Sequence, residues 1–420
     1  PAGLPVCRRE TRADIETGAF PKRRSAADRY CGGSNVGGET LPHRPPLGRV
    51  AEGKSARASP RYSSERSPKT MTLTFSEFLR ILSDSPAFVV TALLAAGVIL
   101  VNGGTDAPNA IAACVAARAI APRRAVLLAA VCNFLGVLAV TAVSPAVAET
   151  VSGMADFGAD SRGALIGLCA GMFAVVLWAA AAWYFGIPTS ESHALIAGLS
   201  GAAIAVQRGL GGICWGEWVK VLYGLGLSAG LGFAAGWAAA RFLRLACRRM
   251  DRRRGQASFR RAQIFGGAAM AFAHGAQDGQ KFMGVFLLGA AMARGQPMEG
   301  AFRVPVWLMA GISLLMAAGT SVGGYKIIRT VGMRMVRLDA HEGFAADTAA
   351  AGALMAASLA GIPVSTTHMK TTALMGVSAS RRLRAVNWRV AGEMAWAWAL
   401  TFPGCGAVGY LTARLFLWWL

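Results

Sequence analysis

The sequence predicts an all-α, polytopic membrane protein built from two inverted-topology repeats, and three observations support this fold class. The 420-residue chain is 54% hydrophobic and only 15% charged, which is too apolar for a soluble protein of this size. Four apolar runs reach the ~20 helical residues needed to cross a bilayer, namely 125–147, 163–185, 217–240 and 390–418. The octapeptide GIPTSESH at 186–193 recurs as GIPVSTTH at 361–368. We therefore expect about ten to twelve transmembrane segments, with breaks or hairpins in some helices.

A second pair of matching motifs lies upstream of the octapeptides. They read NGGTDAPN at 102–109 and HGAQDGQK at 274–281. Asp106 and Asp278 are 172 positions apart, and the octapeptides are 175 apart, so one structural unit is used twice. Polar, glycine-rich breaks inside membrane-length apolar segments are typical of the binding site of a transporter.

Composition divides the chain into four regions. They are a basic N-terminal extension at 1–70, transmembrane repeat 1 at 76–243, a basic loop at 244–261 and transmembrane repeat 2 at 262–420. The extension lacks apolar periodicity, so we expect it to be disordered, and we interpret it as non-native because the first methionine is Met71. The segments 87–118 and 262–293 each exceed one straight span, so we expect both to break at their Asp motifs.

The positive charge indicates membrane topology. The net charge is +21, and nine arginines stand against one acid in 241–261. Basic loops beside membrane spans mark the cytoplasmic side, so this pattern argues against nucleic-acid binding. The loop after Asp106 is basic and the next acidic, whereas the loop after Asp278 is nearly balanced and the next basic. With about five crossings per half, this predicts inverted repeats, a cytoplasmic central loop and outside termini in a bacterial plasma membrane.

Asp106 and Asp278 each lie deep in an apolar segment. A carboxylate there costs several kcal/mol unless it is paired, protonated or bound to a cation. A structural role in capping a broken helix is the alternative. Because both acids recur at matched positions, we favour a role in cation binding.

We interpret the two octapeptides as points where a helix restarts inside the membrane. Pro188 and Pro363 fit the first turn of a helix. Hydroxyl side chains for N-capping are Thr189, Ser190, Ser192, Ser365, Thr366 and Thr367. Free N–H groups and the positive end of the helix dipole make such a terminus an anion site. Two converging termini would hold a multiply charged oxyanion, and plain helix capping is the alternative.

Basic side chains accompany both pairs of motifs. Lys281 follows Asp278 by three residues, and Lys370 follows His368 by two. Either lysine could donate to the anion or neutralise a nearby acid, and the sequence leaves both roles open. His193 and His368 recur at matched positions and favour hairpin support over proton transfer. The residues that we assign to hairpin support are Asn102, Glu191, His193, His274, His368 and Lys370.

The four motifs, in this order, resemble the signature of the inorganic phosphate transporter family of sodium- or proton-coupled phosphate permeases. The resemblance covers residues ~85–418 and includes VNWR at 386–389. It implies phosphate uptake by alternating access, with no catalytic residues, no bound metal and no cofactor besides a coupling cation, H⁺ or Na⁺. It assigns cation coupling to Asp106, Asp278 and Asp347. The phosphate contacts that we expect are Thr105, Asn109, Ser190, Ser192, Gln277, Lys281, Ser365, Thr366 and Thr367.

Departures from the family pattern bear on the coupling ion. Thr105 and Gln277 replace an Asn before each signature Asp, Lys281 replaces a late Asn, and Asn133 stands where sodium-coupled members often have an acid. Proton coupling or co-transport of a metal–phosphate complex therefore stays open beside sodium coupling. A sulfate symporter is one alternative function. A membrane-embedded hydrolase is disfavoured because catalysis usually needs unlike acid and base groups, whereas these acids lie in equivalent motifs.

The eight cysteines form no CxxC or Cys/His cluster, which indicates neither a disulfide framework nor a metal site. We expect phosphate, the coupling cation and the lipid bilayer as partners. The oligomeric state stays open, with a homodimer as one option.

Overall fold

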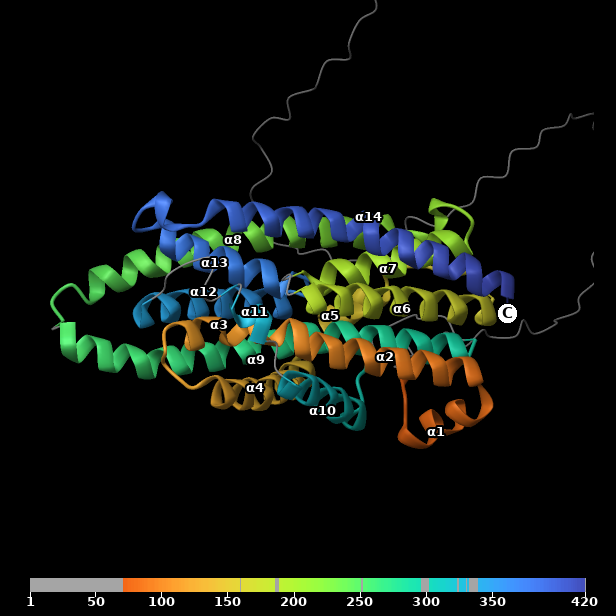
Figure 1. Ribbon diagram of the computed structural model, residues 1–420. Coiled ribbons are helices and arrows are strands. Elements are labelled where there is room, and N and C mark those ends of the chain that lie inside the picture. Colours follow the sequence, from red (N-terminus) through yellow and green to blue (C-terminus); the bar gives the residue numbers. More distant parts are fainter. Residues whose placement is uncertain are drawn as a thin grey trace, which may run out of the picture. The chain divides into compact units, whose positions relative to one another are not determined.

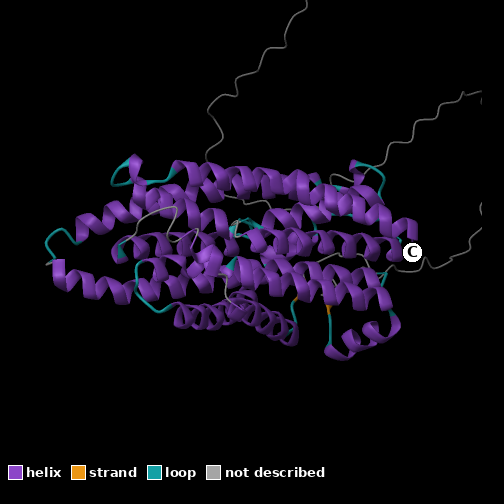
Figure 2. Ribbon diagram, in the orientation of Figure 1, coloured by secondary structure: helices purple, strands orange, loops and turns teal. Residues whose placement is uncertain are grey.

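The computed structural model describes residues 71–158, 160–185, 189–250, 252–295, 302–322, 325–329, 331 and 339–419. This part of the chain is almost wholly helical (Figure 2). The predicted extension at 1–70 and Pro188 lie outside the described residues.

The elements of the first half run from a short strand to a long helix. They are β1 (Met71–Thr72), α1 (Phe75–Asp84), α2 (Pro86–Thr105), α3 (Ala107–Ala116), α4 (Pro122–Val143), α5 (Ala146–Ser152), α6 (Ser161–Phe185), α7 (Glu191–Val206), the 3₁₀-helix η2 (Leu210–Gly212) and α8 (Trp215–Ala246). Those of the second half are α9 (Arg252–Ala293), β2 (Phe302–Arg303), α10 (Val306–Val322), α11 (Tyr325–Arg329), α12 (Ala340–Leu359), α13 (Thr366–Ala379), the 3₁₀-helix η4 (Leu383–Ala385) and α14 (Trp388–Trp419). The two short strands pair in parallel.

Several helices have the length and composition of membrane spans. With α2 and α3 taken together, the described residues include four such stretches, Pro86–Ala116, Pro122–Val143, Ser161–Phe185 and Trp215–Ala246. The helices α7 and α10 are apolar but shorter. Large apolar side chains such as Leu93 and Trp396 point outwards and are 67% and 77% exposed. Such an outer surface fits contact with lipid rather than water. The total of ten to twelve spans stays a prediction.

The element pattern of the first half returns in the second (Figure 1). The helices α8 and α14 both have 32 residues. They begin at Trp215 and Trp388, which are 173 positions apart. The 3₁₀-helices η2 and η4 have the same spacing, from Leu210 to Leu383. Helices pack across the halves: α7 against α14 and α13 against α8, and likewise α4 against α9 and α10 against α2. Each half therefore completes the packing of the other.

Matched glycines allow the closest of these helix crossings. A Cβ at Gly201 in α7 would overlap the carbonyl oxygen of Gly406 in α14. A Cβ at Gly376 in α13 would overlap the carbonyl oxygen of Phe233 in α8 in the same way. Small residues are what lets membrane helices approach so closely. Gly201 and Gly376 are 175 positions apart, the offset of the octapeptides, so the two crossings are equivalent.

One of the two predicted helix breaks is present, and the other prediction is wrong. The helix α2 ends at Thr105 and α3 begins at Ala107, with Asp106 between them. Pro108 lies in the first turn of α3, where its missing N–H costs no hydrogen bond but where it cannot continue the preceding helix. By contrast, α9 runs without interruption through Asp278. The motif HGAQDGQK contains no proline, so nothing there removes a backbone donor.

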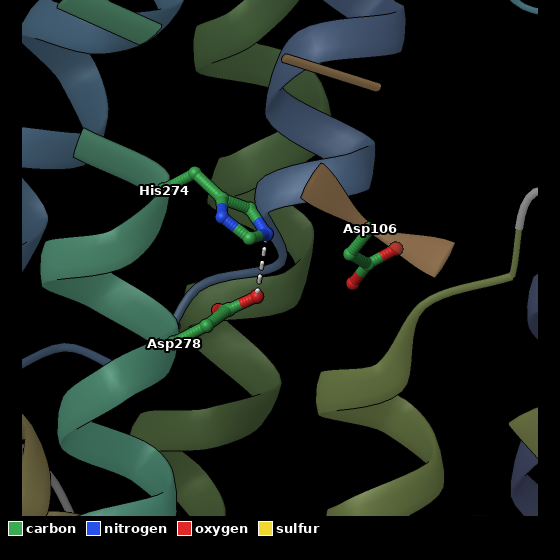
Figure 3. A group of neighbouring side chains, drawn as sticks. All are labelled: Asp106, His274 and Asp278. Atoms are coloured by element: carbon green, nitrogen blue, oxygen red, sulfur yellow. Dashed lines mark ion pairs between the residues drawn. The ribbon is translucent and has the colours of Figure 1, made fainter. Parts of the chain in front are cut away.

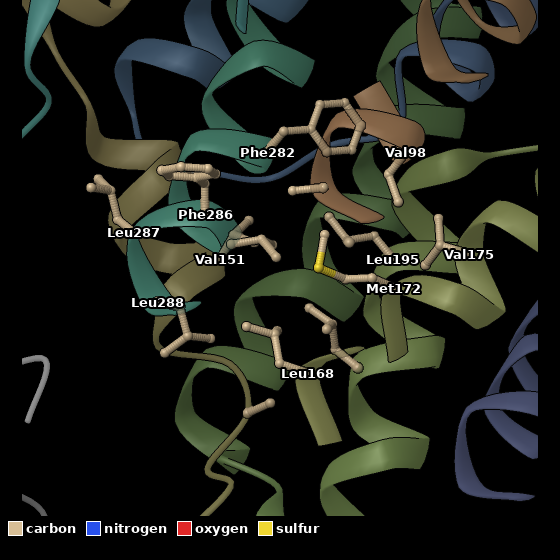
Figure 4. Packing of buried hydrophobic residues seen from close by; sticks show 14 of the residues in the cluster. Val98, Val151, Leu168, Met172, Val175, Leu195, Phe282, Phe286, Leu287 and Leu288 are labelled. Atoms are coloured by element: carbon tan, nitrogen blue, oxygen red, sulfur yellow. The ribbon is translucent and has the colours of Figure 1, made fainter. Parts of the chain in front are cut away.

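Two apolar cores flank the polar motifs. The first packs side chains of α2, α6, α7 and α9, including Val98, Leu168, Leu195 and Phe282 (Figure 4). The second includes side chains of α3, α4, α12 and α13. Asp106 lies at the junction of α2 and α3. Side chains of α2 pack in the first core and side chains of α3 pack in the second, so Asp106 lies where the chain passes from one core to the other.

Candidate functional site

Two carboxylates and one imidazole meet at the centre of the described residues. Asp106 from the α2–α3 break and Asp278 from the middle of α9 face each other, with His274 one turn before Asp278 (Figure 3). One ligand atom of each lies within 4.8 Å of the others. All three residues are at most 2% exposed. Buried carboxylates in this geometry need a positive partner.

Asp106 has only part of its hydrogen-bonding capacity in use. Its Oδ1 accepts a hydrogen bond from Thr367 Oγ1 at 2.7 Å and from Asn109 Nδ2 at 3.4 Å. Its Oδ2 and the Oδ1 of Asn109 have no hydrogen-bond partner among the described residues. Buried oxygens left in this way suit a cation that takes oxygen ligands.

Asp278 is more fully paired. Lys281 Nζ lies 2.7 Å from its Oδ1, while its Oδ2 accepts from Thr366 Oγ1 at 3.2 Å and Asn102 Nδ2 at 3.3 Å. His274 Nε2 lies 3.3 Å from the same oxygen. This carboxylate therefore already has a cationic partner, which Asp106 lacks among its hydrogen bonds.

The ammonium of Lys281 is hydrogen-bonded to protein oxygens. Besides Asp278, it donates to Ser192 Oγ at 2.6 Å and to the carbonyl oxygen of Val364 at 2.7 Å. An ammonium has three hydrogens, so all are engaged in this arrangement. The geometry fits the neutralising role that the sequence left open for this lysine, and contact with phosphate stays a prediction.

The two predicted helix restarts meet at their first turns. Ser190 is the N-cap of α7 and Ser365 the N-cap of α13, and each hydroxyl accepts from the backbone N–H three residues on, at His193 and His368. The two hydroxyl oxygens lie 2.8 Å apart. The first N–H groups of a helix have no partner within it, and the dipole is positive there. Two such ends therefore converge beside the acidic pair.

Thr105 and Gln277 have protein partners in this arrangement. Thr105 donates to the Oε1 of Glu191 in the first turn of α7. Gln277 Nε2 donates to the carbonyl oxygen of Ile362 at 3.0 Å, and its Oε1 accepts from Ser358. Gln277 thus fastens α9 to the segment that leads into α13.

The matched histidines form an aromatic pair in the first turns of α7 and α13. The rings of His193 and His368 lie 4.4 Å apart in an edge-to-face arrangement. Phe402 lies 4.6 Å from the first ring and Trp398 3.7 Å from the second. Both aromatic residues belong to α14, so this pair joins the two hairpins to the last helix.

Asp347 and Lys370 form a separate, fully buried ion pair. Gln263 Nε2 donates to the carboxylate at 2.7 Å, and the ammonium reaches the carbonyl oxygen of Ala110 at 3.3 Å. Asp347 is therefore not part of the group formed by Asp106, His274 and Asp278. Its predicted role in cation coupling stays a prediction, with Lys370 as its partner.

Asn133 belongs to the site in a way that sequence reasoning missed. Its Oδ1 lies 3.0 Å from His274 Nδ1, and its Nδ2 donates to Thr320 Oγ1 at 3.2 Å. An amide oxygen only accepts, so this contact holds the hydrogen on Nδ1 and turns Nε2 towards the carboxylates. The sequence marked Asn133 as a departure from the family pattern, but nothing in it indicated the contact with His274.

Comparison with known proteins identifies the family of this chain. Residues 102–409 match the phosphate transporter family. A "probable low-affinity inorganic phosphate transporter" of Bacillus subtilis (strain 168) is 33% identical over 318 residues, which cover 75% of this chain and 93% of the relative. A protein of the same description from Mycobacterium bovis is 36% identical over 315 residues, covering 75% and 74%.

One solved structure, "The sodium-dependent phosphate transporter", shares the fold. Its TM-score is 0.73 at 21% identity, covering 80% of this chain and 100% of that one. Together with the family match over residues 102–409, these similarities place the protein among multi-pass membrane transporters rather than enzymes. The chain belongs to the phosphate transporter family.

Proposed function

We propose that this protein is a secondary active transporter that imports inorganic phosphate, driven by a cation gradient. The observation that carries the proposal is the meeting of Ser190 and Ser365 at 2.8 Å, beside the buried Asp106 and Asp278. Converging helix N-termini are the backbone arrangement that holds a phosphate. The neighbouring carboxylates supply the place for the coupling cation.

The closeness of the two places provides the coupling. Without a bound cation, the carboxylate of Asp106, which has no cationic hydrogen-bond partner, would repel a phosphate at the N-termini of α7 and α13. A bound cation cancels that repulsion, so each ligand raises the affinity for the other, as linkage requires. A carrier of this kind changes conformation with both ligands bound and so uses the cation gradient to move phosphate.

The duplicated architecture supports alternating access at the interface of the repeats. Two equivalent pairs of helices pack across the halves, α7 with α14 and α13 with α8. In transporters with inverted repeats, one arrangement opens outwards and its mirror opens inwards around a fixed site. We propose the orientation that the loop charges predict, with 244–261 cytoplasmic and both termini outside.

A metal–phosphate complex is the second candidate substrate, and His274 favours it. An imidazole nitrogen and two carboxylates suit divalent transition metals better than they suit sodium. In that case phosphate uptake would require a divalent metal and would stop when a chelator is added. With free phosphate as the substrate, the chelator would leave uptake unchanged.

Uptake of radiolabelled phosphate into proteoliposomes tests the proposed function. Purified protein should carry phosphate that protein-free liposomes do not take up. Arsenate, which has the same charge and shape, should compete, and sulfate should not. Equal competition by sulfate would point to a general oxyanion symporter, and no uptake under any cation gradient would refute the proposal.

A further inference from the structure

The ammonium of Lys281 lies in a cage of oxygen atoms. It contacts the carboxylate of Asp278 at 2.7 Å, the hydroxyl of Ser192 at 2.6 Å and the carbonyl oxygen of Val364 at 2.7 Å. Lys281 is only 2% exposed. A carboxylate, a hydroxyl and a carbonyl are the oxygen ligands with which proteins surround hard cations. The side chain thus fills a place that an inorganic cation could take.

The other half of the molecule has a corresponding acid with a hydroxyl beside it, and an asparagine in place of the lysine. Counting back 172 positions, Asp106 corresponds to Asp278 and Asn109 to Lys281. Counting forward 175 positions from Ser192 gives Thr367, whose Oγ1 lies 2.7 Å from Asp106 Oδ1. The hydroxyl of Thr367 therefore contacts Asp106 directly, whereas its equivalent Ser192 contacts the ammonium that is bound to Asp278.

The polar atoms of this second place are incompletely used. Asp106 and Asn109 are 2% and 3% exposed, yet Oδ2 of the first and Oδ1 of the second have no hydrogen-bond partner among the described residues. Figure 3 shows Asp106 across from Asp278 and His274, and one ligand atom of each lies within 4.8 Å of the others. Buried oxygens of this kind are costly unless something positive binds them.

We propose that the Lys281 ammonium is a built-in substitute for one coupling cation, and that a free monovalent cation binds only at the equivalent place formed by Asp106, Asn109 and Thr367. This inference rests on the proposed function. A tethered ammonium neutralises Asp278 in every state of the cycle but cannot leave on the other side of the membrane. It therefore lowers the repulsion towards phosphate without adding driving force. Each phosphate is carried with one positive charge fewer than in a carrier that binds a free cation at both places.

Two other roles for Lys281 give different expectations. A phosphate ligand needs a free hydrogen, and all three are engaged with protein oxygens. A purely structural bridge between α9 and the hairpins would affect folding or rate, but it would leave the number of carried charges unchanged. The charge count therefore separates the substitute cation from both alternatives.

The test is the reversal potential of phosphate flux in proteoliposomes. The voltage at which net flux vanishes, measured at fixed phosphate and cation gradients, gives the number of charges carried per phosphate. Lys281→Asn places at position 281 the residue that stands at the equivalent position 109. The variant should therefore carry one more positive charge per phosphate than the wild type. This count does not depend on whether the coupling ion is sodium or the proton. An unchanged count would overturn the inference.

Exchanging the two residues supplies a matched control. Asn109→Lys places an ammonium beside Asp106 and should lower the count by one charge. The double variant with Asn109→Lys and Lys281→Asn should return to the wild-type count, because one place is again filled by lysine. A double variant that differed from the wild type would contradict the equivalence of the two places.

Loss of transport in Lys281→Asn would not end the test. The purified, monodisperse variant should then bind one more coupling cation per chain than the wild type at equilibrium, counted as radioactive sodium for sodium coupling or as protons taken up for proton coupling, and an equal number would overturn the inference. Failure of the wild type to carry phosphate would instead refute the proposed function. A wild type that carries phosphate, with a variant of unchanged charge and cation count, would refute only the role of Lys281.

Discussion

The hydroxyl oxygens of Ser190 and Ser365 lie 2.8 Å apart, at the N-caps of two different helices. The two serines are 175 positions apart, the offset of the octapeptides, so each is the equivalent of the other. Equivalent residues of two related units touch only where the axis of the rotation that relates them passes. A ligand at this point would meet the same groups from both halves of the chain.

Replacing either serine should weaken phosphate binding to a similar extent. Ser190→Ala and Ser365→Ala each remove a hydroxyl that can donate to the anion, and a hydrogen bond to a charged group contributes about 1.5–3 kcal/mol. The dissociation constant should therefore rise tenfold or more. Equilibrium binding of radiolabelled phosphate to the purified variants measures it.

Ser228→Ala is the matched control for both serine variants. Ser228 is equally buried, and its hydroxyl donates to the carbonyl oxygen of Leu225 within α8 at 2.7 Å. Its loss should leave the dissociation constant unchanged. The proposed site would be misplaced if the three variants bound phosphate alike.

Asp106→Asn and Asp278→Asn should both abolish net uptake but differ in stability. Asp106→Asn removes the negative charge that the coupling cation requires, and Asp278→Asn leaves an uncompensated ammonium beside the proposed site, while Asn preserves the shape in both. Only Asp278→Asn leaves the ammonium of Lys281 without its carboxylate. Breaking a buried ion pair from one side costs about 3–5 kcal/mol, so this variant should unfold at a lower temperature. Thermal unfolding in detergent, run beside uptake, compares the two.

Removing Lys281 as well should separate the two effects. Asp278→Asn combined with Lys281→Met leaves no unpaired charge and should recover most of the lost stability. Equal stability of Asp106→Asn and Asp278→Asn would mean that the ion pair with Lys281 contributes nothing to the fold.

The second ion pair should act on stability rather than on coupling. Lys370→Met leaves Asp347 buried and unpaired and should cost about 3–5 kcal/mol, whereas Lys370→Met with Asp347→Leu should come close to the wild type. We expect the double variant to keep cation-driven uptake, because this pair is separate from the Asp106 group. Phosphate uptake that no longer responds to the cation gradient would instead assign Asp347 the coupling role suggested by the family resemblance.

Local chemistry made part of this site predictable from the sequence. The hydroxyl residues of the octapeptides predicted N-caps, and two of the six, Ser190 and Ser365, take that role; the motif at 102–109 predicted a helix break, which lies at Asp106. The same reasoning failed at Asp278, where no proline interrupts α9. There, resemblance between the motifs suggested a break that the backbone does not need.

Contacts between distant segments were beyond the sequence. Lys281 meets the carbonyl oxygen of Val364, 83 positions away, and no side-chain pattern marks a backbone carbonyl as a ligand. Asn133 and His274 are 141 positions apart, so neither residue alone indicates the other. The spacing of three residues made the pair of Lys281 with Asp278 one of the open options, but only the folded structure shows that Ser192 and Val364 engage the rest of the ammonium.

Accumulation of phosphate against its gradient tests the central claim most directly. Proteoliposomes with equal phosphate on both sides receive an inward gradient of sodium or, separately, of protons, and the internal radiolabelled phosphate is followed over time. We predict that one of these gradients raises internal phosphate above the external concentration, and that an ionophore which dissipates this gradient returns it to equality. Equilibration at the same rate with and without either gradient would contradict cation-coupled transport.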